Sequence, residues 1–215
     1  MDTFDHIVIG AGSAGCAVAA RLSEDPVREV LLIEAGGSDR RLEARAPAAF
    51  PGLFHKDRDW DYVTEPEPGC EGRRIYQPRG KLIGGCSAMN AMLWVRGSNL
   101  DYDGWGIPGW SWDEVLPYYL KIEDHFLTDG EHGSGGPMRI RRIDTPDPTT
   151  TAFVDAAVAE GIPRCEDLSG PVLEGVQVSA TTTSGGRRWS TARGYLDPAR
   201  KRANLTVMKI GRAHV

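Results

Sequence analysis

The sequence opens with the pattern of one strand–helix–strand unit. Residues 5–9 form a short apolar run that ends in the segment Gly10-Ala11-Gly12-Ser13-Ala14-Gly15. Small and apolar residues typical of a closely packed helix continue to residue 22, and a second apolar run at 30–33 ends in Glu34. Short apolar runs on either side of such a helix predict neighbouring parallel strands in an α/β sheet.

The glycine spacing in this segment predicts a dinucleotide site. Gly10 permits a tight turn off the strand, Gly12 lets the backbone approach a pyrophosphate, and Gly15 lets the helix pack closely on the sheet. The amide groups of the helix N-terminus stabilise phosphates. Glu34 follows after about 20 residues, where an acidic side chain binds ribose hydroxyls. Ser13 and Ala14 complete the predicted pyrophosphate loop.

Composition narrows the class of protein. With 215 residues, 40% of them apolar, the chain can bury a core, and its net charge of −5 argues against binding nucleic acid or an anionic membrane. No apolar run is long enough to span a bilayer, and the acidic N-terminus does not match a secretory leader. The four cysteines lack metal-ligand spacing. We therefore expect a cytoplasmic protein without a metal site.

A second glycine cluster lies further along the chain. After the long, mostly irregular segment 35–79, which we expect to lie over a ligand, comes Arg79-Gly80-Lys81-Leu82-Ile83-Gly84-Gly85-Cys86-Ser87. Alone, this cluster fits an anion-binding loop or a plain tight turn. The patterns that follow predict helices at 88–95, 112–120, 150–160 and 188–200 and strands at 137–141, 176–181 and 204–208.

The second cluster carries a family resemblance. Residues 79–90 resemble the first signature of the glucose–methanol–choline (GMC) flavin oxidoreductases. Further similar stretches follow in order at 32–37, 95–97, 101–105, 109–118, 185–193 and 204–207. The chain is identified as an N-terminal fragment of a member of this family, of the choline and alcohol dehydrogenase type.

The resemblance implies the fold and its organisation. We expect a truncated α/β protein, with an FAD-binding, Rossmann-like doubly wound sheet and the beginning of an α+β substrate-binding domain. The expected ranges are 1–132 for the first part of the FAD-binding domain and 133–186 for the start of the substrate-binding domain. Residues 187–209 would return to the FAD-binding domain, and 210–215 would be a non-native tail.

The resemblance also implies FAD as cofactor. Some relatives tether FAD through a histidine just before the signature asparagine. Met89 stands at that position, so noncovalent FAD is expected. For Cys86 two interpretations stay open, contact with the flavin and, as the favoured one, burial as a small apolar residue. The implied cofactor-binding residues are Gly10, Gly12, Ser13, Ala14, Gly15, Glu34, Ala35, Arg79, Lys81, Leu82, Gly84, Gly85, Cys86, Ser87, Asn90, Ala91, Met92 and Leu93.

The implied reaction is oxidation of the CH–OH group of a small-molecule alcohol, with hydride transfer to the flavin and formation of an aldehyde or ketone. Family members carry the catalytic base in a C-terminal part that this sequence lacks, so we name no catalytic residue, and His214 is not that base. We expect the chain alone to be insoluble and inactive. A NAD-linked dehydrogenase and a noncatalytic nucleotide-binding fragment are the alternatives. The particular alcohol, the electron acceptor and the oligomeric state stay open.

The remaining polar and aromatic residues receive structural interpretations. The tryptophans are expected to pack in the interior, and Arg187 and Arg188 to lie on a solvated basic face. His125 and His132 flank a glycine-rich loop without metal-ligand spacing.

Overall fold

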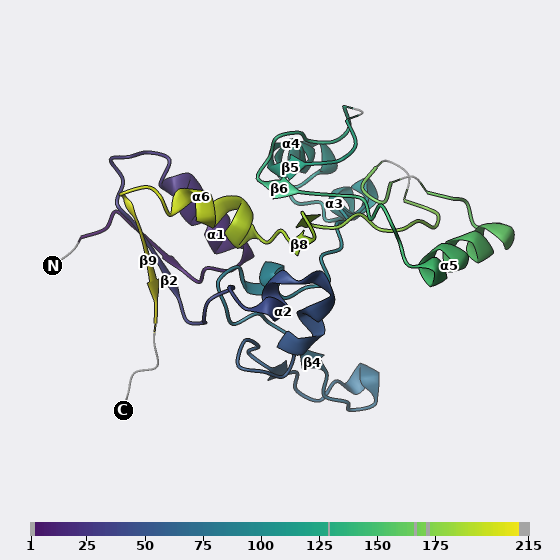
Figure 1. Cartoon of the computed structure of the whole chain (residues 1–215), viewed down its shortest axis with the longest axis horizontal. Coiled ribbons are helices and arrows are strands. Elements are labelled where there is room, and N and C mark those ends of the chain that lie inside the picture. The colour runs from purple at the N-terminus through teal and green to yellow at the C-terminus, as the bar shows by residue number, and fades with distance from the viewer. Residues whose placement is uncertain (1–2, 129, 166, 171–172, 211–215) are drawn as a thin grey trace. The chain divides into compact units, whose positions relative to one another are not determined.

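The computed structural model describes residues 3–128, 130–165, 167–170 and 173–210 (Figure 1). The chain divides into two compact units. The first comprises residues 1–91 and 185–215, and the second comprises residues 92–184. These bounds differ from the expected domain ranges, which placed the first boundary near residue 133. The expected non-native tail lies outside the described residues, apart from Ile210.

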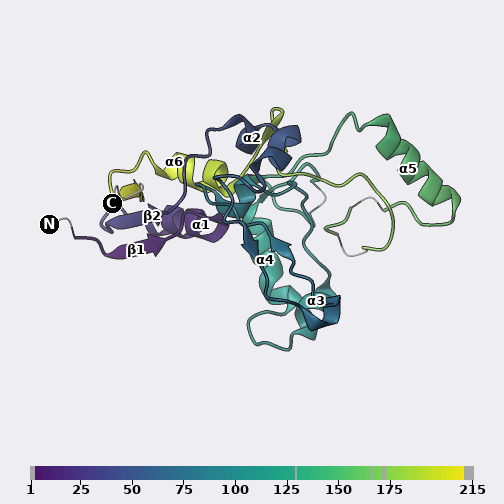
Figure 2. The ribbon, with the colours of Figure 1, turned by 90° about the horizontal axis from the view of Figure 1, so that it is seen from below.

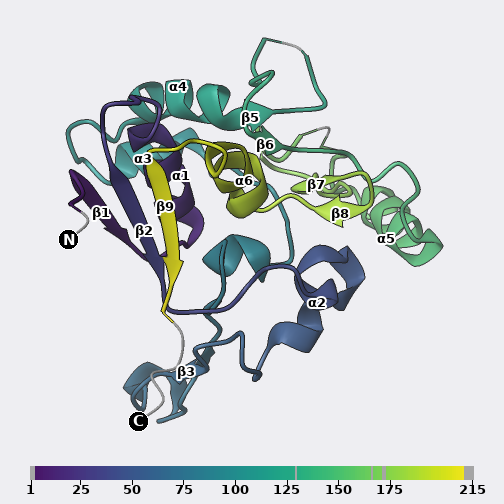
Figure 3. The ribbon, with the colours of Figure 1, turned by 60° about the vertical axis from the view of Figure 1, so that its left-hand side comes forward.

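A parallel three-stranded sheet forms the centre of the first unit. Strand β2 (Val30–Glu34) lies between β1 (His6–Ile9) and β9 (Leu205–Lys209), as Figures 2 and 3 show. Val30 pairs with His6 on one side and with Leu205 on the other. The central strand is buried, which explains its continuous apolar run. All three strands were predicted from the sequence.

Helix α1 (Ser13–Leu22) joins β1 to β2 and packs with small residues. Cys16, Ala19 and Ala20 are buried on the face that contacts the strands and the π-helical segment η4 (Ala192–Leu196). Helix α6 (Asp197–Ala199) follows η4 directly. The helix expected at 188–200 therefore begins only at Ala192, because Arg187–Arg188 form the short strand β8.

The long segment after β2 is built from short elements. They are α2 (Leu42–Arg45), η1 (Pro47–Leu53), β3 (Tyr62–Val63), η2 (Pro68–Cys70), β4 (Tyr76–Gln77) and η3 (Gly85–Ala88). Asp59 fixes much of it, because its carboxylate accepts hydrogen bonds from the Tyr76 hydroxyl and the amides of His55, Asp61 and Arg79. Burial opposes ionisation of Asp59, but these hydrogen bonds outweigh it and lower the pKa of its carboxyl group.

The second unit contains helices α3 (Asn99–Gly104), α4 (Trp112–Ile122) and α5 (Pro148–Ala159), with strands β5 (Glu123–Asp124), β6 (Met138–Arg139) and β7 (Thr183–Ser184). The Glu114 carboxylate accepts hydrogen bonds from the amide and hydroxyl of Ser111 at the start of α4, as the predicted N-cap position requires. In the described part of the chain, no helix has the length and apolarity needed to cross a membrane.

The helix expected at 88–95 is wrong beyond Ala88. Met92 has a left-handed backbone with φ of 64°, which ends any helix. Its carbonyl accepts a hydrogen bond from the Thr182 amide at 2.8 Å, and the Trp94 amide donates to the Ala180 carbonyl at 3.0 Å. Extended pairing within the second unit therefore replaces the local helix. Residues 176–181, expected as a strand, form isolated bridges at Val176 and Thr181.

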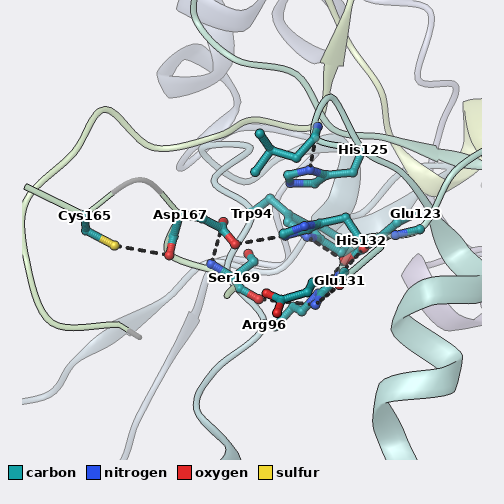
Figure 4. Close-up of polar contacts among 11 residues, drawn as sticks. Trp94, Arg96, Glu123, His125, Glu131, His132, Cys165, Asp167 and Ser169 are labelled. Atoms are coloured by element: carbon teal, nitrogen blue, oxygen red, sulfur yellow. Dashed lines mark hydrogen bonds and ion pairs between the residues drawn. The ribbon is translucent and has the colours of Figure 1, made fainter. Parts of the chain in front are cut away.

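A buried ion pair holds the second unit together. Arg96 and Glu123 are both buried, and the guanidinium donates two hydrogen bonds to the two carboxylate oxygens (Figure 4). Arg96 also donates to the carbonyl oxygens of Glu131 and Ser169, and the Gly133 amide donates to Glu123 at 3.1 Å. Residues near positions 96, 123, 131–133 and 169 thus meet at one pair of charges.

Replacing Glu123 with glutamine should lower the free energy of unfolding by about 3 kcal/mol, because the buried guanidinium loses its counter-charge. Chemical denaturation measures this change. The matched control is Glu24→Gln, which removes one partner of the exposed Arg21–Glu24 pair and should change stability by less than about 1 kcal/mol. Equal effects of the two substitutions would contradict a central role for the buried pair.

Candidate cofactor site

The candidate site begins at the N-terminus of α1. Gly12 is the N-cap residue, so no side chain caps the helix, and the first turn contains no acidic residue. The space beside Gly10 and Gly12 is open, with no atom within 4 Å of where a Cβ would stand. Free amide groups and the positive end of the helix dipole therefore face an open space, an arrangement suited to an anion.

The second glycine loop packs directly on the first. The Gly84 amide donates to the Ala11 carbonyl at 2.7 Å, and the Ser87 amide donates to Ser13 Oγ at 3.2 Å. A Cβ on Gly85 would lie only 2.7 Å from the Gly12 Cα. The structure thus brings together the two glycine motifs that the sequence singled out.

Glu34 lies at the end of β2, beside the first loop. Its carboxylate accepts hydrogen bonds from the amides of Ala11 at 2.7 Å and Gly36 at 2.6 Å, one on each oxygen. Sequence analysis missed these two bonds, which fix the strand end to the glycine loop. Each carboxylate oxygen has a second lone pair, so the expected contacts to ribose hydroxyls are compatible with this geometry.

A cavity of about 830 Å³ opens next to Glu34. The expected residues Ala35 and Lys81 line it, together with Arg58 and Trp60, which sequence analysis did not select. The Lys81 ammonium lies 4.5 Å from the centre of the Trp60 ring. The tryptophan is 39% exposed, so the expected interior packing is wrong for this residue. Trp105 and Trp110 are likewise exposed.

The end of the second loop is held by residues from the C-terminal part of the first unit. Ser87 Oγ lies 2.9 Å from Thr191 Oγ1 and accepts a hydrogen bond from the Thr191 amide at 3.1 Å. Asn90 is exposed, and its side-chain oxygen accepts a hydrogen bond from Arg188 at 2.7 Å. Cys86 is exposed, so its expected burial is wrong.

The remaining expected site residues have different environments, and Ala91 is exposed beyond Asn90. Leu82 is fully buried in a small core with Ala44, Leu53, Ala88 and Met89, so its side chain lines no open surface. The Arg79 amide donates to Asp59. Met92 and Leu93 belong to the second unit, where Met92 is buried and Leu93 exposed.

A second polar cluster lies in the second unit (Figure 4). His125, His132 and Asp167 bring potential metal-ligand atoms within 4.8 Å of one another. The two imidazole rings are stacked, with centroids 4.0 Å apart and planes 19° apart, so one ion cannot lie in the plane of both rings. His125 Nδ1 also accepts the Leu127 amide, which leaves the proton on Nε2. The geometry therefore opposes a metal site here.

Burial and the neighbouring His132 lower the pKa of His125 to about 4. The imidazole of His125 is therefore neutral at pH 7, and it stacks on Phe126 as well as on His132. The His132 ring approaches the Asp167 carboxylate at 2.9 Å. These contacts lie beside the Arg96–Glu123 pair (Figure 4).

Comparison with known proteins places this geometry in a family. The family model described as GMC oxidoreductase matches residues 4–214. The chain belongs to the GMC oxidoreductase family. The resemblance noted in the sequence is confirmed, and so is the α/β fold class.

The chain is similar to individual GMC-type proteins of several bacteria. An oxygen-dependent choline dehydrogenase of Rhizobium rhizogenes is 43% identical over 95% of this chain and 38% of its own length. An uncharacterised GMC-type oxidoreductase of Mycobacterium bovis is 45% identical over 97% of this chain and 41% of its own length. The chain thus spans about two fifths of the length of these relatives.

Solved structures agree with the family assignment. Pyridoxine 4-oxidase from Mesorbium loti superposes with a TM-score of 0.90 and 42% identity, over 96% of this chain and 42% of that structure. An FAD-dependent oxidoreductase from Chaetomium thermophilum superposes with a TM-score of 0.87 and 29% identity, over 96% of this chain and 38% of its own.

The contact between helix and loop can be tested with two helical glycines. A Cβ on Gly15 would lie 1.9 Å from the Gly10 carbonyl oxygen, whereas a Cβ on Gly104 in α3 would meet no atom within 4 Å. Gly15→Ala should therefore destabilise the protein by about 1–3 kcal/mol. Gly104→Ala should be neutral or stabilise it by up to about 1 kcal/mol. Thermal unfolding measures both, and a harmless Gly15→Ala substitution would disprove the close approach.

Proposed function

We propose that this chain is the FAD-binding part of an oxidoreductase that acts on the CH–OH group of a small alcohol. The observation that carries the proposal is the convergence of both glycine loops and Glu34 at the open N-terminus of α1. Family membership and the superposition on an FAD-dependent oxidoreductase support the choice of FAD.

The residues present fit this cofactor. The uncapped amides of α1 and the open space beside Gly12 suit the pyrophosphate, and the buried Glu34 carboxylate suits the ribose hydroxyls. The neighbouring cavity has an aromatic wall at Trp60 and cations at Arg58 and Lys81. We assign it to the adenosine end of FAD.

When bound, FAD would accept the hydride from the alcohol carbon. This chain's residues would hold and orient it: Gly84–Ser87 by packing against the pyrophosphate loop, and Asn90 by its exposed amide beside the flavin. We assign FAD binding to the first unit and the beginning of the substrate-binding domain to the second. Met92 and Leu93, which belong to the second unit, remain proposed cofactor-binding residues. No catalytic residue is assigned within residues 1–215, and a cytoplasmic location stays part of the proposal.

A direct measurement of cofactor binding distinguishes the FAD hypothesis from the NAD hypothesis. The measurement uses a fusion protein, called the completed protein from here on. It joins residues 1–209 of this chain to the C-terminal part of the Rhizobium rhizogenes choline dehydrogenase, which this chain does not match. A yellow preparation with flavin absorption supports the proposal. NAD binding without flavin would favour a NAD-linked dehydrogenase, and binding of neither would refute the proposal.

Glu34→Ala should weaken FAD binding to the completed protein by about 1–3 kcal/mol, because ribose hydroxyls lose their acceptor. A flavin titration measures the dissociation constant, and thermal unfolding identifies any variant that is not folded. Glu24→Ala, which removes an exposed carboxylate of the same unit, is the control and should leave the affinity unchanged. Equal affinities for Glu34→Ala and the unchanged protein would disprove the ribose assignment.

Noncovalent binding predicts that FAD can be released. Met89 is buried in the small apolar core and its thioether cannot form the histidyl bond to flavin. Acid or heat precipitation of the completed protein should therefore leave the flavin in the supernatant. A parallel sample of denatured protein mixed with free FAD corrects for nonspecific retention. Flavin that stays with the washed polypeptide beyond this correction would show a covalent link.

A further inference from the structure

Arg188 is buried, whereas the sequence predicted that it would lie on a solvated basic face. Only 1% of the residue is exposed, while its neighbour Arg187 is exposed. Its Nη1 donates to Asn90 Oδ1 at 2.7 Å and to the Ser87 carbonyl at 3.3 Å. Its Nε and Nη2 are buried and have no hydrogen-bond partner within the described part of the chain.

Such a burial is costly for a cation. Removal of the guanidinium from water lowers the pKa of Arg188 to about 10, and burial alone accounts for this direction. The group remains charged at pH 7. Among the residues that the structure describes, no carboxylate pairs with Arg188. A buried charge without a counter-ion destabilises a fold, so simple stability does not explain this residue.

The burial of Nε and Nη2 limits the contacts that the Arg188 guanidinium can make with a ligand. Because Nε and Nη2 are shielded, a ligand cannot reach them without displacing protein atoms. Nη1 is directed at Asn90, whose side chain is exposed. Arg188 therefore acts through its neighbours rather than by direct contact.

We propose that Arg188 is a positioning residue that fixes the orientation of the Asn90 side-chain amide for contact with the flavin. This inference rests on the proposed function. A guanidinium can only donate, so the amide oxygen of Asn90 must face Arg188 and its NH₂ group must be turned away from it. The same Nη1 bonds the Ser87 carbonyl, which ties the orientation of Asn90 to the end of the second glycine loop.

A double-mutant cycle in the completed protein tests this role. The variants are Arg188→Met, Asn90→Ala and both together, with Arg187→Met as the matched control. The measured quantities are the dissociation constant of FAD and the visible absorption spectrum of the bound flavin. Arg188→Met should weaken FAD binding about tenfold and shift the spectrum, as should Asn90→Ala. The double variant should match Asn90→Ala within about twofold, and the control should match the unchanged protein.

Each outcome separates the hypotheses. Unchanged binding and spectrum in Arg188→Met, or an additive loss of about a hundredfold in the double variant, would overturn the positioning role while leaving FAD binding intact. Absence of FAD binding to the unchanged completed protein would overturn the proposed function itself. If Arg188→Met does not fold, Arg188→Lys replaces it in the same cycle: non-additivity with Asn90→Ala supports the role, and additivity refutes it.

Discussion

The close approach of two glycine-rich backbones is the constraint on which the first unit depends. The Gly84 amide bonds the Ala11 carbonyl, and Gly85 faces Gly12 at a distance that admits no Cβ. At the same place Gly15 lies against the carbonyl of Gly10. Side chains here would push apart the strand end, the helix start and the second loop. The glycines thus determine the backbone geometry of the candidate site.

The second unit is organised differently, by charge rather than by backbone contact. Arg96 and Glu123 form a buried pair that also bonds the carbonyls of Glu131 and Ser169 and the amide of Gly133. The stacked His125 and His132 rings lie in the same polar interior. In such a network, the conformation of loops with few apolar residues depends on a small number of well-paired polar groups.

Sequence patterns correctly predicted the helices and strands that depend on neighbouring residues in the chain. The three parallel strands, the helix after the first glycine motif and the helix beginning at Trp112 follow from periodicity and capping residues. The apolar run at 88–95 has helical periodicity, yet residues 92–94 pair with residues 180–182 and do not form a helix. Similarly, nothing in the sequence distinguishes Arg188 from Arg187, because burial of one and exposure of the other depend on the tertiary fold.

The double attachment of Glu34 has a consequence for the energetics of recognition. Its carboxylate is held in place by two amides of the protein itself, those of Ala11 and Gly36. In the proposed function, the acceptor atoms would therefore be arranged before a nucleotide binds, and little conformational freedom would be lost on binding. Under the proposed function, selectivity at this position would come from a rigid template, because a ligand with displaced hydroxyls would not be accommodated by rotation of the glutamate.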